Sequence, residues 1–117
     1  MATKIITYEE CCRMKSLNGY CPKPLEKFSD YLSKKWTISI IITIGNFRKL
    51  RFNDLLSRLE RATAKILSAR LKELEREKIV NRNFFNEIPL KVEYSLTKKG
   101  LTLRDSLIPL INWAEKR

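Results

Sequence analysis

The chain contains no histidine, and this absence excludes several kinds of functional site at once. Histidine is the commonest general base in enzymes and a ligand in zinc sites of the mixed Cys/His type. The three cysteines cannot form a four-cysteine zinc site within one chain, and an odd, clustered set is not a disulfide scaffold. With only three glycines, no glycine-rich phosphate loop is present. We therefore expect no metal, no cofactor and no enzymatic activity.

Long hydrophobic runs are also missing. The longest apolar-rich segment, Trp36–Ile44, is about half as long as a membrane span needs to be. The first twenty residues lack the continuous apolar stretch of a secretory signal. These two absences predict a cytoplasmic protein with no membrane partner.

Basic residues, in contrast, are abundant. The 24 Lys and Arg residues against 13 Asp and Glu give a formal net charge of +11. Such an excess is self-repulsive unless a polyanion balances it, and nucleic acid is the usual partner. A chain from a lysine-rich proteome would have the same composition without that function. At 117 residues and 44% hydrophobic content, the chain suits one compact domain with an additional arm.

The N-terminal part divides into an arm and a helix. Residues 1–20 are weakly patterned and are interpreted as an N-terminal arm. Pro22 and Pro24 then favour the start of a helix, because the first turn has amide donors without partners. Apolar side chains follow at helical spacing and predict one apolar face, formed by Leu25, Phe28, Tyr31 and Leu32.

The isoleucine-rich segment Trp36–Ile44 is ambiguous from its residues alone. Its β-branched residues favour a buried strand. The Gly45-Asn46 pair that follows equally suits a buried helix that ends in a glycine cap. Periodicity does not separate these alternatives in a short, continuously apolar segment.

Two short helices separated by Arg61-Ala62-Thr63 are predicted in the middle of the chain. After a basic link at residues 48–51, the first spans Asn53–Glu60 with Asn53 as its N-cap. The second starts after its own N-cap, Thr63, and continues to about Lys78. Each has a leucine-rich face, formed by Leu55, Leu56 and Leu59 in the first helix and by Leu67, Leu71 and Leu74 in the second. This arrangement is the outline of a helix-turn-helix.

A hairpin and a long helix complete the predicted order of elements. The strand-like segments Ile79–Phe85 and Lys91–Leu96, with a turn between them, indicate a wing directly behind the second helix. Thr97 is the predicted cap of a terminal helix through Trp113, with a kink expected at Pro109. Its apolar residues exceed what a small core absorbs, which suggests a partner surface. Packing against the chain's own N-terminal arm is the alternative.

The second helix carries a basic stripe opposite its leucines. Because successive residues advance by about 100° around a helix, this stripe comprises Lys65, Ala69, Lys72 and Arg76, and Ser68 and Glu73 flank it. We expect Lys65 and Ser68, in the first turns, to reach base edges in a DNA groove. Lys72 and Arg76 are expected at phosphates, and Thr63 with the N-terminal amides at another. The alternative is a solvated charged face, partly neutralised by neighbouring glutamates.

Several short motifs occur in a fixed order from Cys21 to the C-terminus: Cys21-Pro22, Lys35-Trp36-Thr37, 51–55, 67–74 and 92–100, followed by Trp113. In order and spacing they resemble the HxlR-type regulators, a branch of the MarR-like winged-helix proteins. The resemblance implies a mainly α fold with a small β-hairpin (α+β), a winged helix-turn-helix domain over residues 21–117 with N- and C-terminal dimerisation helices. It also implies a helix for Trp36–Ile44. Arg61-Ala62-Thr63 stands where the family usually has Gly-Ile-Ser or Gly-Ile-Thr, so the preferred DNA sequence is expected to differ.

The resemblance also draws attention to Cys21. In several relatives the cysteine at this position senses oxidants or electrophiles. A basic helix start favours thiolate, which makes a redox-sensing role physically reasonable for Cys21. An inert, half-buried side chain and a disulfide between subunits are the alternatives. Cys11 and Cys12 lie outside the resemblance and are candidates for resolving thiols.

These expectations combine into a homodimeric transcriptional regulator that reads a pseudo-palindromic operator in double-stranded DNA. Its half-sites would lie about one helical turn apart, roughly 34 Å. Arg82 and Lys91 of the hairpin would contact flanking phosphates or the minor groove, and an oxidant or small molecule would act as inducer. One alternative is a sequence-tolerant, chromatin-like architectural protein, whose affinity would hardly differ between cognate and random DNA. Another is a protein-docking winged helix with no role on DNA.

Overall fold

The computed structural model describes residues 19–116, which divide into two compact units at Ser33 and Lys34. Among its described residues, the first unit contains the helix α2 (Lys23–Leu32). Pro22 is its N-cap and Pro24 lies in its first turn, as predicted. The predicted arm falls almost entirely on residues outside the described part, as do Cys11 and Cys12.

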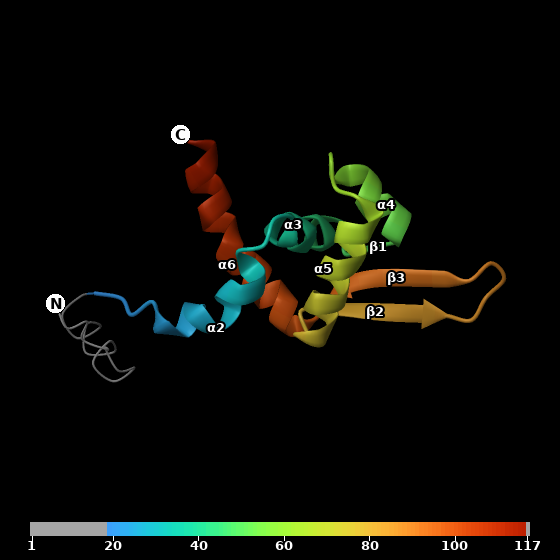
Figure 1. Ribbon diagram of the computed structural model, residues 1–117, viewed down its shortest axis with the longest axis horizontal. Helices are drawn as coiled ribbons and strands as arrows, with labels where there is room; N and C mark the ends of the chain where they lie inside the picture. The colour runs from blue at the N-terminus through green and yellow to red at the C-terminus, as the bar shows by residue number, and fades with distance from the viewer. Residues whose placement is uncertain (1–18, 117) are drawn as a thin grey trace. The chain divides into compact units, whose positions relative to one another are not determined.

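The second unit is built from helices and a small antiparallel sheet, in the order α3, β1, α4, α5, β2, β3, α6 (Figure 1). The strands β1 (Lys49–Leu50), β2 (Val80–Phe85) and β3 (Lys91–Leu96) pair in the order β1-β3-β2. The sheet and the helices confirm the predicted α+β class. Figure 1 shows the β2–β3 hairpin projecting from the rest of this unit. None of the described helices combines the length and apolarity needed to cross a membrane.

Helix α3 (Thr37–Phe47) forms the centre of the core and contacts α4, α6 and β3. The side chains at 37, 40, 41 and 44 are fully buried, and this spacing is that of one helical face. The strand alternative is therefore wrong. The predicted glycine cap is also wrong, because the helix continues past Gly45 and turns at Arg48, where φ is 66°. A Cβ at Gly45 would overlap the Arg104 side chain of α6, so this glycine serves close packing between helices.

The predicted basic link at 48–51 contains β1, which pairs with Ser95 and Tyr94 of β3. Helix α4 (Phe52–Arg58) follows at once, with Arg51 as its N-cap in extended conformation. The prediction of Asn53 as N-cap is therefore wrong by two residues. Arg51 directly follows the paired strand, so its backbone is already extended where the helix begins.

Helix α5 (Ala64–Arg76) begins as predicted: the Thr63 hydroxyl accepts a hydrogen bond from the Ile66 amide at 3.1 Å. Its leucine face is fully buried. The helix ends slightly earlier than predicted, in a turn where Lys78 has a φ of 61° and the Ile79 amide donates to the Leu74 carbonyl at 2.9 Å. This is the Schellman arrangement, with a lysine where glycine is usual.

The hairpin and the last helix are joined at Thr97, which caps α6 (Lys98–Glu115) through the Gly100 amide at 2.9 Å. The same hydroxyl donates to the Lys78 carbonyl at 2.6 Å, which ties the end of α5 to the start of α6. A Cβ at Gly100 would overlap the Ile79 carbonyl, so the two backbones meet closely here. The helix is continuous through Pro109, and the kink expected there stays a prediction.

Candidate nucleic-acid interface

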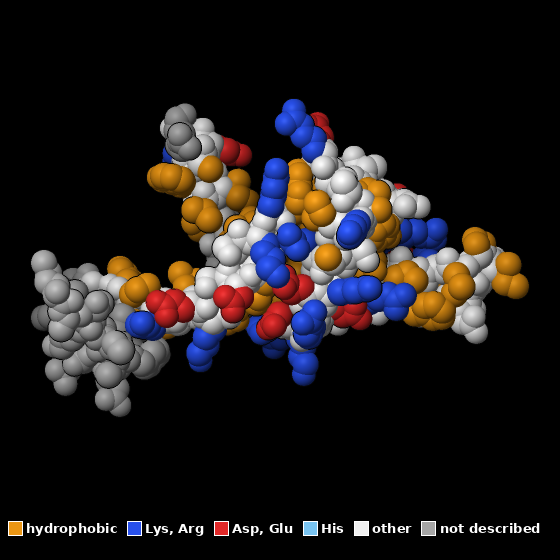
Figure 2. Space-filling model, viewed as in Figure 1, with side chains coloured by type: hydrophobic (Ala, Val, Ile, Leu, Met, Phe, Trp, Pro, Cys, Tyr) orange, Lys and Arg blue, Asp and Glu red, His pale blue; other side chains and the backbone are white. Residues whose placement is uncertain are grey.

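Helix α5 presents its predicted basic stripe to solvent. Lys65, Ala69, Lys72 and Arg76 are exposed, and Ser68 is half-buried at the margin of the stripe. Figure 2 shows Lys and Arg side chains gathered over the region of α5. The opposite face of the helix is buried in the core, so the packing of α5 leaves this stripe outward.

Glu73, which flanks the stripe, is paired with a lysine from outside it. Glu73 accepts a hydrogen bond from the Lys34 ammonium at 2.6 Å, at the start of the same unit. Within residues 19–116, Lys65, Lys72 and Arg76 form no ion pair. The solvated-face alternative relied on glutamates that neutralise these cations, and Glu73 does not do so.

A cleft of about 300 Å³ lies between α5 and the hairpin. Its lining comes from both elements: Ser68, Lys72 and Glu75 of α5, Arg82 of β2 and Tyr94 of β3. Arg82 and Tyr94 are directly opposite in the strand ladder, so both side chains point to the same face of the hairpin. Two cations and two hydroxyl groups therefore surround a space large enough for a phosphate group, with Glu75 as the one acid at its edge.

Tyr94 was not among the predicted site residues. The alternation of residues 91–96 predicts the strand, but the face on which Tyr94 lies depends on the pairing of β3 with β2. The match of Arg82 with Tyr94 in the ladder is the signal that places it beside a predicted contact.

Lys91, the other predicted hairpin contact, lies on the opposite face. Its ammonium is 3.0 Å from a Glu93 carboxylate oxygen and 5.2 Å from the centre of the Phe85 ring. The hydrogen bond from Lys91, together with Lys49 at 3.9 Å, holds the pKa of Glu93 below its usual value. The structure thus brings Arg82 to the face of α5 and does not bring Lys91 there.

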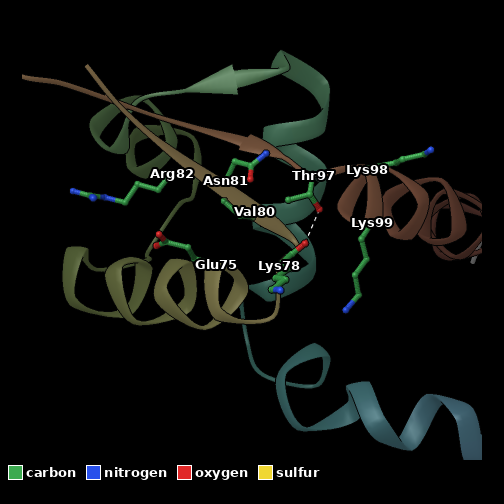
Figure 3. A pocket seen from close by; sticks show the side chains of 8 residues that line it. All are labelled: Glu75, Lys78, Val80, Asn81, Arg82, Thr97, Lys98 and Lys99. Carbon is green, nitrogen blue, oxygen red and sulfur yellow. Dashed lines mark hydrogen bonds between the residues drawn. The ribbon is translucent and has the colours of Figure 1, made fainter. Parts of the chain in front are cut away.

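A second, wider cavity of about 530 Å³ lies where α5 ends and α6 begins. Lysines 78, 98 and 99 line it together with Arg82, and none of these lysines was predicted as a site residue. Figure 3 shows Lys98 and Lys99 pointing in different directions, and the Thr97 hydroxyl is engaged with the Lys78 carbonyl. The Lys99 ammonium donates to the Glu77 carbonyl at 3.2 Å. The cavity therefore extends the basic surface beside the hairpin, but its lysine side chains do not converge on a single binding position.

Cys21, the predicted redox residue, is half-buried directly before the N-cap Pro22. It is disulfide-bonded in this structure. In this state it is an oxidised sulfur rather than the thiolate that a sensor needs before it reacts. Over residues 19–116 no group of three Cys, Asp or Glu side chains is arranged to hold a metal ion.

Helix α6 leaves large apolar side chains exposed along its length. Leu101, Leu110 and Trp113 are 49%, 51% and 64% exposed, whereas Leu107 is buried. Figure 2 shows hydrophobic side chains near the C-terminal end of this helix. The predicted apolar surplus is thus present on the surface of the second unit, where a partner could cover it.

The fold and its parts have clear relatives. The HxlR-like helix-turn-helix family matches residues 31–117. The uncharacterized HTH-type transcriptional regulator YvaP of Bacillus subtilis is 40% identical over 94 residues, which cover 80% of this chain and 85% of YvaP. The HTH-type transcriptional regulator YodB of the same organism is 37% identical over 99 residues, which cover 85% of this chain and 87% of YodB.

Solved structures agree with these matches. The redox regulator HypR in its oxidized form has a TM-score of 0.75 at 33% identity, covering 80% of this chain and 96% of HypR. The reduced form of YodB from B. subtilis has a TM-score of 0.68 at 35% identity, covering 82% of this chain and 92% of that one. The predicted family and the winged helix-turn-helix fold are confirmed. The chain is a transcriptional regulator that belongs to the HxlR-like helix-turn-helix family.

Proposed function

We propose that the chain is a homodimeric regulator that binds specific sequences in double-stranded DNA with α5 in the major groove. The observation that carries the proposal is the cleft between α5 and the hairpin, where Lys72 and Arg82 come together from two elements. A groove-reading helix needs neighbouring cations that hold the phosphate strand beside it. The proposal involves no chemistry on a substrate, and it places the protein with DNA in the cytoplasm.

Each predicted residue has a role in this arrangement. Lys65 and Ser68, in the first turns of α5, would read base edges, and the small Ala69 would let the helix backbone approach the groove. Thr63 and the free amides of the first turn would hold one phosphate, because the helix dipole is positive there. Lys72 and Arg82 would hold another in the cleft, with Tyr94 as a hydroxyl partner. Arg76 would contact the phosphate strand at the far end of α5. Lys91 would support the hairpin through Glu93 instead of contacting phosphate.

Dimerisation would follow from the exposed apolar residues of α6. Leu110 and Trp113 are three residues apart and lie on one side of α6. A second copy that covers this side would bury both, and the dimer would need its two α5 helices about one DNA turn apart, roughly 34 Å. Sedimentation velocity on the full chain tests this step.

Selection of bound duplexes from a random pool tests the function. The proposal predicts enrichment of an inverted repeat, with affinity at least about a thousandfold above that for random DNA. Lys65→Ala should relax the preference at one base position and cost about 1–3 kcal/mol there. Enrichment of no motif, with tight binding to every duplex, would indicate the architectural alternative. Weak binding even at low salt would indicate the protein-docking alternative.

We further propose that DNA binding responds to thiol oxidation. The support is the disulfide at Cys21 and the likeness to proteins described as the redox regulator HypR and as the reduced and diamide-treated forms of YodB. In the reaction, Cys21 and a second thiol lose two protons and two electrons to an oxidant such as diamide and form a disulfide. DNA affinity should differ about tenfold between reduced and oxidised protein, or about 1.4 kcal/mol.

Matched cysteine variants test the response. Cys21→Ser should abolish it and keep basal binding, whereas Cys11→Ser and Cys12→Ser should only modify it. Equal DNA affinity in reductant and in diamide would refute redox control and leave the DNA-binding proposal intact.

A further inference from the structure

The far end of the hairpin is apolar, and none of the proposed DNA contacts uses it. Three side chains here are named the tip cluster: Phe84, which is 55% exposed, Ile88, which is fully exposed, and Leu90, which is 63% exposed. Figure 2 shows hydrophobic side chains gathered at this projecting end. Scattered apolar side chains on a surface are ordinary, but a contiguous group on a projecting element marks a contact surface.

One member of the tip cluster, Phe84, lies on the face of the hairpin that borders α5. Val80, Arg82 and Phe84 alternate along β2, so their side chains point to the same side of the sheet. Val80 is buried, and Arg82 lines the cleft shared with α5. Phe84 therefore follows the proposed phosphate contact outward on the same face, opposite Val92 in the ladder.

The length of the hairpin suits a reach from one groove to the next. The six residues of β2 span on the order of 20 Å. The distance from the middle of a major groove to the middle of the adjacent minor groove is about 9 Å, the sum of half the width of each groove. With α5 in the major groove and Arg82 at the phosphate strand, the tip has length to spare to enter the adjacent minor groove.

The charges of the tip disfavour a phosphate contact there. Residues 86–90 contain no cation and one acid, Glu87, so the tip has no charged group with which to bind a phosphate. The tip is also too small for a stable protein interface. Three side chains supply at most on the order of 500 Å², whereas each partner in a stable interface buries about 800 Å². An apolar contact with bases and sugars fits both observations.

We propose that the tip cluster is a minor-groove wedge, in which Ile88 inserts between two base pairs and kinks the duplex. This inference rests on the proposed DNA-binding function. Apolar side chains that enter a minor groove partly unstack one base step and bend DNA by roughly 20–90°. Pyrimidine–purine steps unstack most readily, so a TA or CA step should be preferred beside each half-site, where α5 makes no contact.

The experiment uses the full chain and a duplex selected by the wild type, with fluorophores at both ends to report bending by energy transfer. A 2-aminopurine at the flanking step reports unstacking. Wild-type protein should bend the duplex and raise the 2-aminopurine signal. Ile88→Ala should lose most of both effects and keep the α5 footprint. Because Ile88 is fully exposed, this variant should fold normally. Asn86→Ala, in the same turn, is the matched control and should bend DNA like the wild type.

The flanking step gives a second measurement. Replacing TA by a stiff step there should weaken wild-type binding about tenfold and leave Ile88→Ala unchanged. Equal bending by wild type and Ile88→Ala, or a straight duplex with both, would overturn the wedge. So would a change in oligomeric state caused by Ile88→Ala, because the tip would then be a protein contact. Failure of the wild type to select any sequence would instead refute the proposed function itself.

Discussion

Arg82 and Lys91 lie on opposite faces of the hairpin, and replacing each by alanine separates two roles that a hairpin cation can have. Arg82 is exposed in the cleft beside Lys72, so we expect it to neutralise one DNA phosphate. Lys91 is paired with Glu93 at 3.0 Å, so we expect it to neutralise none. The sequence alone does not distinguish the two residues.

The magnitude follows from counterion release. Each neutralised phosphate contributes about 0.9 to the slope of log affinity against log salt concentration. Arg82→Ala should reduce that slope by about 0.9, whereas Lys91→Ala should leave it unchanged. Between about 50 and 200 mM salt, wild-type affinity should therefore fall about 3.5-fold more than that of Arg82→Ala.

Fluorescence anisotropy with one labelled duplex at several salt concentrations measures both slopes. The loss in Arg82→Ala should be similar on selected and random DNA, because phosphate contacts carry no sequence information. An equal reduction of slope in both variants, or a larger one in Lys91→Ala, would refute the assignment of faces. A sequence-dependent loss in Arg82→Ala would mean that this residue reads bases.

The remaining predictions concern stability and assembly. The backbone of Arg61 is left-handed, with a φ of 69°, a conformation that is strained for any residue with a Cβ but not for glycine. Arg61→Gly should therefore raise the free energy of unfolding by about 1 kcal/mol in urea titrations. An equal gain in Arg61→Ala would show that the charge of Arg61, not its backbone, is responsible. Gly100→Ala should lower the same free energy by about 1–3 kcal/mol, because its Cβ would meet the Ile79 carbonyl; an unchanged urea midpoint would contradict this close approach. The pKa of Glu93 lies below its usual 4.5 in the folded state, so its ion pairs stabilise the protein above that pH and are lost as the pH falls through the lowered pKa. Glu93→Gln should therefore melt below the wild type at pH 7 and should approach it in acid; a constant difference in melting temperature would refute this linkage. A chain ending at Ile108 should sediment as monomer or become insoluble, and an intact dimer would move the interface away from α6.

Local signals made α5 and the terminal helix α6 predictable. Thr63 and Thr97 cap helices through amides three residues away, and the buried leucines of α5 repeat at helical spacing. These interactions join residues within about one helical turn of each other, so they can be read directly from neighbouring positions. The family resemblance decided what local physics left open, the helix at Trp36–Ile44.

Features that join distant segments were visible only in the tertiary structure. The N-cap of α4 is Arg51, which follows directly after the pairing of β1 with β3. Gly45 does not end a helix; its missing side chain leaves room for the Arg104 side chain. The strand register likewise decided that Arg82 joins Lys72 in the cleft and that Lys91 turns to Glu93. The sequence by itself determined α5, the hairpin strands and α6 together with the leucine face of α5, because those follow from contacts a few residues apart. The tertiary structure decided which side of each element faces which neighbour, because that depends on how separate segments pair and pack.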